Sequence, residues 1–152
     1  MAQQSNTSSV STKLVLRIID ANLNRCREGL RVVEDFLRFV FDDGILYKDI
    51  RSIRHSVDKI LRSKYGKVIN ERESFEDPGR QIPETVVKEV PAVITANFKR
   101  VEEALRVLEE CSKVIAPELS ADFKKQRYLT YTVEKAVYLK YGKIIYNEYD
   151  FK

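Results

Sequence analysis

The sequence predicts a mainly α-helical protein, a four-helix bundle that arises from an internal duplication of a helical hairpin. Apolar residues recur at helical spacing over four long segments. The chain also aligns with itself: residues 21–34 (ANLNRCREGLRVVE) match 96–109 (ANFKRVEEALRVLE), and residues 51–69 (RSIRHSVDKILRSKYGKVI) match 127–145 (RYLTYTVEKAVYLKYGKII). Two separated blocks in the same order, at offsets of 75 and 76, indicate a repeat and not a chance likeness of helices.

The duplication also predicts how the chain is divided. We expect residues 1–12, which are polar, to form a disordered tail and residues 13–152 to form a single helical domain. Within this domain the first repeat unit covers about 16–69 and the second about 92–146, joined by a connecting loop at 70–91. A chain of 152 residues is long enough to bury a hydrophobic core.

The first repeat unit should contain two helices. Apolar residues at helical spacing predict the first helix from about residue 13 or 16 to residue 41. The following DDG should end this helix, with Gly44 in the left-handed conformation. The second helix should run from about residue 46 to residue 65, where Gly66 ends it.

The second unit repeats this pattern. Its first helix is predicted at 94–115 and ends at Ala116-Pro117, and its second is predicted at about 121–141 and ends at a glycine. The segments KVIN (67–70) and KIIYNEY (143–149), which follow the second helix of each unit, are rich in residues with a preference for strands. They could pair as a short β-ribbon.

The composition excludes several classes of protein. Apolar residues make up 43% and charged residues 33% of the chain, which is typical of a soluble globular protein. No apolar run is long enough to cross a membrane, and we expect a cytoplasmic location with Cys26 and Cys111 reduced. A net charge of +4 is too small for a dedicated DNA-binding protein, so nucleic acid is not expected as a ligand; the charge suits small anionic ligands about equally well.

Both copies of the repeated helix carry Asn, Arg, Glu, Arg and Glu three residues apart. The members are Asn22, Arg25, Glu28, Arg31 and Glu34 in the first copy, and Asn97, Arg100, Glu103, Arg106 and Glu109 in the second. We interpret Arg31, Glu34 and their equivalents as ion pairs on the solvent side of the helix. The Asn-Arg pairs lie beside the apolar stripe, near Gly29 or its equivalent Ala104, where small residues allow close approach. They should face the bundle interior and meet either the other repeat or an anionic ligand.

Other polar residues are weaker indicators of a site. His55 is the only histidine and follows Arg54. The chain has no His and Cys cluster for zinc, no Walker A sequence and no GxGxxG.

The EDPGR segment at 76–80 could contribute to a phosphate site. Asp77 could bind Mg²⁺, Gly79 allows close approach of the backbone, and Arg72 and Arg80 could bind phosphate. The alternative is an ordinary Asp-Pro-Gly turn.

Several of these motifs together resemble a known family. In order they are IIDANLNRCREGLRVVEDFLRF, Arg54-His55, Asp77-Pro78-Gly79, ITANFKRVEEALRVLEE and FKKQRYLTYTVEKA. They are similar to the small monofunctional hydroxymethylpyrimidine-phosphate kinases of thiamin biosynthesis, which in some bacteria are fused to thiamin-phosphate synthase. The resemblance extends over about residues 17–139. The chain departs from the family in the linker, where Glu73, in place of Asp, follows Arg72.

The resemblance implies an activity, a set of ligands and a set of site residues. The reaction would transfer the γ-phosphate of ATP, with Mg²⁺, to hydroxymethylpyrimidine phosphate. The acceptor is already an oxyanion, so the site needs cations and correct positioning but no general base. The implied catalytic residues are Arg25, Arg54, His55, Asp77 and Arg100, with Asp77 also binding the metal. The implied substrate-binding residues are Asp20, Asn22, Gly29, Asn97 and Arg127, and the implied residues for the nucleotide phosphates are Arg72, Gly79 and Arg80.

Two other functions remain open from the sequence. One is a non-catalytic helical module that binds the pyrimidine phosphate or docks a synthase. The other is an RNA-binding bundle that uses the lysines of the two KYGK segments, Lys64, Lys67, Lys140 and Lys143. Helix C-termini favour cations in any case, which accounts for these lysines without RNA. Thiamin-phosphate synthase is expected as a pathway partner, and the tyrosine-rich C-terminal segment leaves open a homodimer.

Overall fold

The structure, a computed structural model, describes residues 4–84 and 90–145. In this part of the chain the regular elements are five α-helices with several short 3₁₀ and π turns, and there is no β-strand. The α-helices are α1 (Gln4–Asp35), α2 (Gly44–Ile60), α3 (Tyr65–Asn70), α4 (Val90–Ile115) and α5 (Ser120–Ile145). The mainly α-helical class predicted from the sequence is therefore confirmed.

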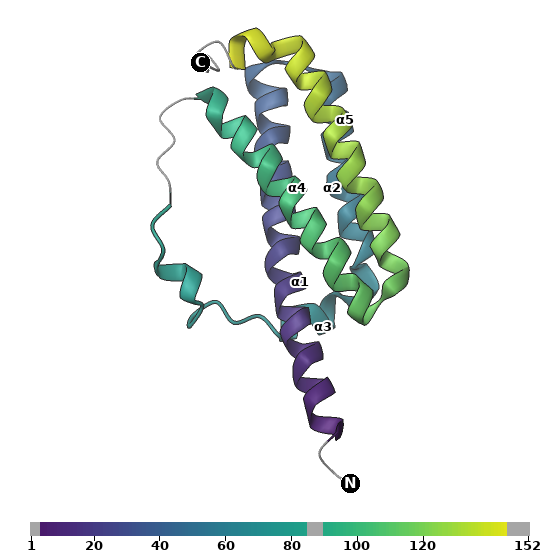
Figure 1. Cartoon of the computed structure of the whole chain (residues 1–152). Coiled ribbons are helices and arrows are strands. Elements are labelled where there is room, and N and C mark those ends of the chain that lie inside the picture. Colours follow the sequence, from purple (N-terminus) through teal and green to yellow (C-terminus); the bar gives the residue numbers. More distant parts are fainter. Residues whose placement is uncertain (1–3, 85–89, 146–152) are drawn as a thin grey trace, which may run out of the picture.

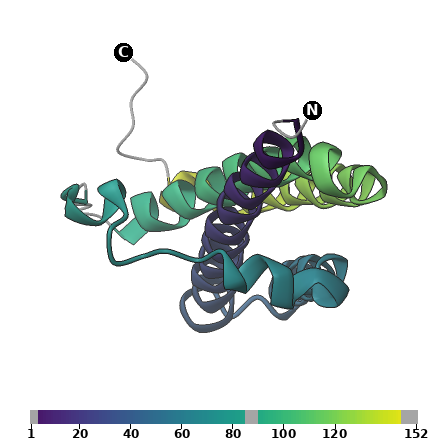
Figure 2. The ribbon, with the colours of Figure 1, turned by 90° about the horizontal axis from the view of Figure 1, so that it is seen from below.

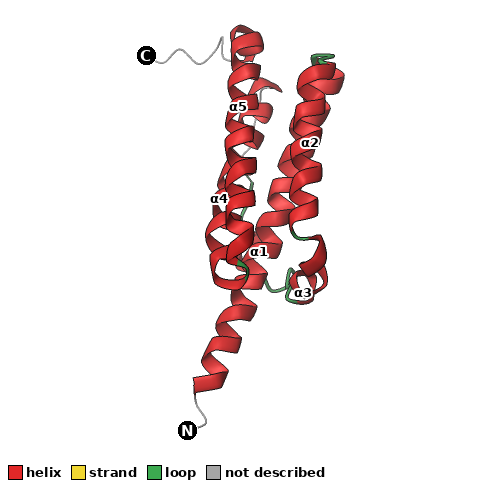
Figure 3. Cartoon of the chain, turned by 90° about the vertical axis from the view of Figure 1, so that its right-hand side faces the viewer, coloured by secondary structure: helices red, strands yellow, loops and turns green. Residues whose placement is uncertain are grey.

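The four long helices form two hairpins that lie against each other. Helix α1 packs on α2 and α4 packs on α5, while between the hairpins α1 contacts α4 and α2 contacts α5. Figure 3 shows the α4–α5 pair on one side and α2 on the other, with α1 between them in this view. In Figure 1 α1 ascends and α4 descends, so the first helices of the two hairpins are antiparallel.

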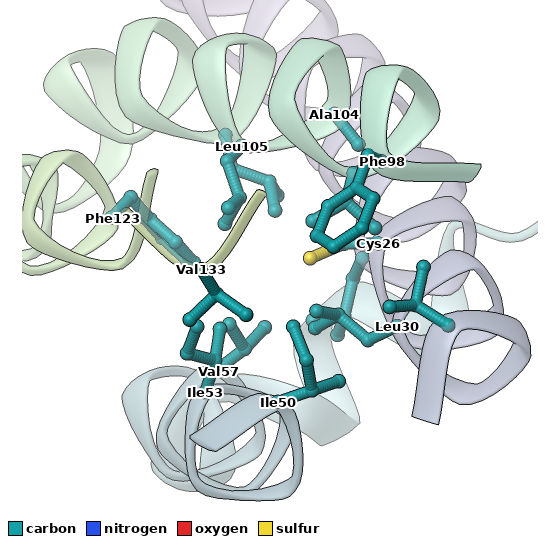
Figure 4. Packing of buried hydrophobic residues seen from close by; sticks show 14 of the residues in the cluster. Cys26, Leu30, Ile50, Ile53, Val57, Phe98, Ala104, Leu105, Phe123 and Val133 are labelled. Atoms are coloured by element: carbon teal, nitrogen blue, oxygen red, sulfur yellow. The ribbon is translucent and has the colours of Figure 1, made fainter. Parts of the chain in front are cut away.

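The hydrophobic core lies between these helices, and each of the four contributes to it. Figure 4 shows side chains from all four helices converging on a common interior. Among the most deeply buried are Leu30 of α1, Ile50 of α2, Leu105 of α4 and Phe123 of α5. Burial of these apolar faces is the main force that holds the hairpins together.

Helix α1 begins much earlier than its apolar pattern. It starts at Gln4, so residues 4–12, which we predicted to be a disordered tail, are helical here. A helix that is already nucleated by a packed amphipathic segment can extend into residues of modest helix propensity, because each further residue adds a hydrogen bond without a new nucleation cost.

The reversal between α1 and α2 differs from the prediction in its details. Helix α1 ends in a π turn (Phe36–Val40), in which the amide of Phe41 donates to the carbonyl of Phe36 at 3.1 Å. The left-handed residue is Asp42, with φ of 50°, and Gly44 instead begins α2. Aspartate tolerates this conformation better than most residues. The side chain of Asp43 caps α2 by accepting from the amides of the second and third residues after it.

The predicted β-ribbon is wrong for the described residues. The segment 67–70 lies in α3, and residues 143–145 lie at the end of α5; residues 146–149 are outside the described part. Accordingly, neither Gly66 nor Gly142 ends a helix. Helix α3 packs on α1 and completely buries Val68, so packing outweighs the strand preference of these residues. The predicted end of α4 at Ala116-Pro117 is confirmed, since a separate 3₁₀ turn begins at Pro117.

The linker after α3 leaves the bundle and contains only one 3₁₀ turn (Pro78–Gln81) in its described part. Figures 1 and 2 show it on the side of α1 that faces away from α2 and α5. Its first residues are attached to α1, and this attachment decides where the linker can contribute to a site.

Candidate functional site

Helices α1 and α4 approach each other closely at Gly29 of α1. A Cβ atom at this position would lie 2.8 Å from Cγ2 of Val101 and 3.2 Å from the carbonyl oxygen of Asn97, both on α4. Real Cβ atoms essentially never come closer than 3.0 Å to another atom, so an alanine at this position would force Val101 or the backbone of α4 to shift. The structure thus gives Gly29, predicted to bind substrate, a role in helix packing.

A groove of about 520 Å³ lies beside this crossing, between α1 and α4. Its lining consists of Asn22 and Arg25 from α1, with Ala96, Lys99, Arg100, Glu103, Ala104 and Val107 from α4. Three residues that the sequence assigned to one site, Asn22, Arg25 and Arg100, are therefore brought together. Asn22 and Arg25 come from the first hairpin, and Arg100 comes from the second.

The two arginines of this groove are exposed, although the sequence predicts that they face the bundle interior. Arg25 is rotated by about 100° around the helix axis from its buried neighbour in the sequence, and this rotation places Arg25 at the surface. Within the described part of the chain neither arginine forms an ion pair; the guanidinium of Arg25 donates only to Oδ1 of Asn22, at 3.4 Å. Two guanidinium groups without carboxylate partners face one groove, which favours an anionic ligand.

The two asparagines make the same local hydrogen bond in both hairpins. Asn22 donates from Nδ2 to the carbonyl of Ile18 at 2.9 Å, and Asn97 donates to the carbonyl of Val93 at 2.8 Å. This bond fixes the amide of Asn22 with its oxygen toward Arg25. Asn97 lies instead opposite Gly29 at the helix crossing.

Arg54, predicted to be catalytic, binds a buried carboxylate. It donates from Nε to Oε2 of Glu34 at 2.7 Å and from Nη2 to Oε1 at 3.3 Å. The side chain of Glu34 is only 2% exposed, so our interpretation of Glu34 as a surface residue is wrong. The hydrogen bonds that Arg54 donates to Glu34 raise the pKa of Arg54, so its guanidinium group stays charged at this contact.

The second hairpin contains a matching contact. Arg127, predicted to bind substrate, donates from Nε to Oε2 of Glu109 at 3.0 Å, and its Nη2 lies 2.9 Å from the same oxygen. Glu109 is also buried, so its interpretation as a surface residue is wrong as well. Arg31 and Arg106 are themselves exposed, as expected, and reach the buried Glu34 and Glu109 from the helix surface, at 3.5 and 3.3 Å.

Arg54 and His55 lie away from the groove between α1 and α4. Arg54 lines a second groove of about 470 Å³ between α1 and α2, with Asn24, Arg27, Glu28 and Arg31. His55 is exposed on α2. The three arginines of this second groove all bind carboxylates, because Arg27 pairs with Asp58 at 2.7 Å and Arg31 pairs with Glu34. The second groove is therefore less suited to an anion than the first.

Asp20 and Arg72, assigned to substrate and nucleotide respectively, bind each other. Arg72 donates from Nε and Nη2 to the two carboxylate oxygens of Asp20, both at 2.8 Å. This bidentate pair raises the pKa of Arg72 and attaches the start of the linker to α1. Arg17 adds a hydrogen bond to the carbonyl of Glu73 at 3.2 Å. Glu73 accepts from the amides two and three residues later and stabilises the turn.

The remaining linker residues form the Asp-Pro-Gly turn that was the alternative to a phosphate site. Asp77 accepts from the amide of Gly79 at 2.8 Å, and Arg80 donates to the carbonyl of Phe75 and lies over its ring. Among the described residues no group of three or more His, Cys, Asp or Glu could hold a metal ion. A single exposed carboxylate such as Asp77 still fits Mg²⁺, because Mg²⁺ in nucleotide sites takes most ligands from phosphates and water.

Two charged residues of the first groove were not assigned from the sequence. Lys99 and Glu103 lie on the same face of α4 as Arg100. Glu103 lies three residues after Arg100, so the helical period contained its signal, whereas the position of Lys99 directly before Arg100 gave none.

The known relatives of this chain are consistent with one another. A model of the ThiD2 family matches residues 17–136. The chain is 40% identical over 128 residues to a thiamine-phosphate synthase of Gloeobacter violaceus, covering 82% of this chain and 37% of that protein. It is 40% identical over 126 residues to that of Thermosynechococcus vestitus (81% and 35%) and 37% identical over 130 residues to that of Synechocystis (84% and 37%).

The chain therefore spans little more than a third of the length of these relatives. No solved structure matches the chain. In the described residues, no helix has the length and apolar character needed to span a bilayer.

Proposed function

The chain belongs to the ThiD2 family, and from this premise we propose that it transfers the γ-phosphate of ATP to 4-amino-5-hydroxymethyl-2-methylpyrimidine phosphate, giving the diphosphate. One observation carries the proposal: Arg25 and Arg100 face one groove from opposite helices and lack carboxylate partners among the described residues. Guanidinium groups bind phosphate oxygens in a bidentate manner, so the groove suits a phosphorylated ligand.

This reaction requires cations and correct positioning of the two substrates in the groove. The acceptor is a phosphate oxyanion and attacks without losing a proton, so the protein's task is to hold two anionic groups together and neutralise their charge. Arg25 on α1 and Arg100 on α4 would each bind phosphate oxygens and bring the groups into line. Asn22, whose oxygen accepts from Arg25, orients that guanidinium.

Mg²⁺ would be held by the nucleotide phosphates and by one carboxylate, that of Asp77 in the linker. When bound, it neutralises charge on the phosphates. The Asp20–Arg72 pair holds the first part of the linker on α1. This is the helix that supplies Arg25, so the anchor favours Asp77 and Arg80 reaching the ligand from the outer side of α1.

Four residues implied by the resemblance act through the fold in this proposal. Arg54, Arg127, Asp20 and Arg72 are all engaged with oppositely charged side chains of the protein. We assign to them the positioning of helices and linker, not contact with the reacting groups.

We also propose that the two hairpins arose by duplication. Both first helices place an asparagine against their own backbone, an arginine at the same groove and a glutamate in the interior. This repetition supports the self-alignment of the sequence. It implies two half-sites of related chemistry, one for the acceptor and one for the nucleotide.

Structural features weigh against the RNA-binding alternative. Lys140 of the second KYGK segment is bound to Asp43, at 2.5 Å, and is thereby partly neutralised. The non-catalytic module remains the rival, with the same groove but no chemistry. We propose thiamine-phosphate synthase as a pathway partner, since the relatives bear that name.

The test is incubation of the protein with Mg-ATP and the pyrimidine phosphate, followed by detection of the diphosphate. Arg25→Ala and Arg100→Ala should each lower kcat/KM by about 100-fold or more, with unchanged circular dichroism. Arg106→Ala is the matched control, because Arg106 is an exposed arginine of α4 that does not line the groove. Binding without turnover would favour the non-catalytic module, and wild-type activity in both arginine variants would refute the assignment of the groove.

A further inference from the structure

Lys99 lies at the edge of the groove where α4 meets α5. Its side chain is 56% exposed and lines the groove together with Arg100. Its ammonium group, however, is directed to α5, 2.8 Å from Oε1 of Glu134 and 3.3 Å from Oε2 of Glu102. A lysine with a long flexible side chain thus stands beside a cationic groove but is bound to two carboxyl groups.

These two carboxyl groups are in an unfavourable environment. Glu102 is 6% exposed and the side chain of Glu134 is 21% exposed. Oε1 of Glu102 and Oε2 of Glu134 are buried and have no hydrogen-bond partner in the described part of the protein. Two ionised carboxylates share one ammonium group, so an excess negative charge is buried unless the pair takes up a proton.

We propose that Lys99 is a third phosphate-binding cation of the groove and that Glu102 and Glu134 hold it until the ligand arrives. When Lys99 moves to the phosphate, the carboxyl pair loses its counter-ion and binds one proton from solvent. The net charge of the pair then changes from −2 to −1; the salt bridges of Lys99 to the two carboxylates are broken, and no covalent bond is broken. The inference deepens the proposed function and rests on it.

The electrostatics of the cluster agree with this exchange. Burial, followed by the neighbouring carboxyl group of Glu134 and its charge, raises the pKa of Glu102 to about 7 even with Lys99 in place. The charged groups acting on Glu102 are Lys99 of its own helix and Glu134 of α5. The other charged groups of the groove are Arg25 on α1 and Arg100 and Glu103 on α4. Removal of the lysine would raise the pKa further, so the pair would be protonated at neutral pH.

A purely structural link between α4 and α5 predicts a different behaviour. If Lys99 only joined the two helices, its replacement would change stability and leave ligand binding and proton uptake unchanged. Lys113 provides the comparison, since it is also a half-exposed lysine of α4 and pairs with Glu110 at 3.0 Å, away from the groove.

The experiment is calorimetric titration of the full chain with inorganic pyrophosphate at about pH 7.5, in buffers of different ionisation enthalpy. The count of protons is compared between wild type and variants, because phosphates themselves titrate near neutral pH. On binding pyrophosphate, wild type should take up as much as one proton more than Glu102→Gln. Lys99→Met should bind pyrophosphate about tenfold more weakly without this extra uptake, while Lys99→Arg restores binding and Lys113→Met resembles wild type.

The outcomes separate the two proposals. Pyrophosphate binding that is absent, or that does not depend on Arg25 and Arg100, would refute the phosphate groove itself. Binding that depends on the arginines but is unchanged in Lys99→Met, or an equal proton count in wild type and Glu102→Gln, would overturn the role of Lys99 alone. Circular dichroism of each variant verifies that it is folded.

Discussion

Replacement of Arg54 by alanine should destabilise the protein strongly. The loss of activity that follows from unfolding could be mistaken for a catalytic effect. Arg54 makes two hydrogen bonds to Glu34, at 2.7 and 3.3 Å, and the glutamate is 2% exposed. Removal of the arginine leaves a carboxylate in the interior with only a distant ion pair to Arg31 at 3.5 Å. Breaking a buried pair from one side costs about 3–5 kcal/mol.

The same magnitude follows from the bonds themselves. A hydrogen bond to a charged group contributes about 1.5–3 kcal/mol, and Arg54 donates two. Arg31 binds the same carboxylate but is 57% exposed and farther away, so Arg31→Ala should cost only about 0–1 kcal/mol. Two arginines that contact one glutamate therefore differ several-fold in their expected effect.

Urea denaturation followed by circular dichroism measures this difference. Arg54→Ala should shift the midpoint to lower urea with an unchanged m value, and the double variant Arg54→Met, Glu34→Leu should recover most of the loss, because no charge is left buried. Arg25→Ala should unfold like wild type. A free energy of unfolding for Arg54→Ala within about 1 kcal/mol of wild type would refute the interpretation of this pair as a structural contact and return Arg54 to the list of catalytic candidates.

Two further predictions concern the helix crossing and the reversal after α1. Gly29→Ala should destabilise the protein by about 1 kcal/mol or more, because the new Cβ atom would collide with Val101. Gly66→Ala should raise the melting temperature, because the Cβ atom would enter open space and alanine favours a helix more than glycine does. Equal effects of the two substitutions would contradict the close approach at Gly29. Asp43 has a lowered pKa because of its bonds to Lys140 and to the backbone, so its contribution is present above its unfolded pKa and is lost as pH falls through the acid range. Asp43→Asn should therefore be less stable than wild type at neutral pH and approach it below about pH 4 in thermal melts, and a constant difference would argue against the charge.

The long helices could be predicted from the sequence because burial dominates their formation. Leu30 and Leu37 repeat on one face of α1, and the structure buries both. Helix ends were less predictable, since they depend on contacts outside the segment. The segment around Val68 has a strand preference, but its packing on α1 keeps it helical. Glycine at 66 and 142 was taken as a stop signal although neither residue has the left-handed conformation.

The site could be predicted in part for a related reason. The repeat grouped Asn22, Arg25 and Arg100, and the structure places all three in the lining of one groove, because equivalent segments of two packed helices meet near the crossing. The burial of Glu34 was missed, although Leu30 and Leu37 lie four residues before and three after it, on the same face of the helix. The residue type favoured a surface position, and the partner from α2 is visible only in three dimensions.

The position of the buried glutamate is the same in both halves of the proposed duplication, but the position of its arginine partner is not. Glu34 and Glu109 occupy equivalent positions, but their arginines do not: Arg127 aligns with Arg51, and Arg54 aligns with Thr130. Any arginine of the second helix that reaches the carboxylate satisfies it. An arginine required only by the fold can therefore move by one helical turn between the two halves.

Arg25 and Arg100 behave differently. They occupy equivalent positions in the two halves, yet neither forms an ion pair in the described part of the chain, and both are exposed. Packing and charge compensation, which explain the buried pairs, therefore give no reason for an arginine at these two places. A ligand that carries negative charge into the groove between α1 and α4 would supply that reason, and it would require both arginines at fixed positions because phosphate oxygens are bound with defined geometry.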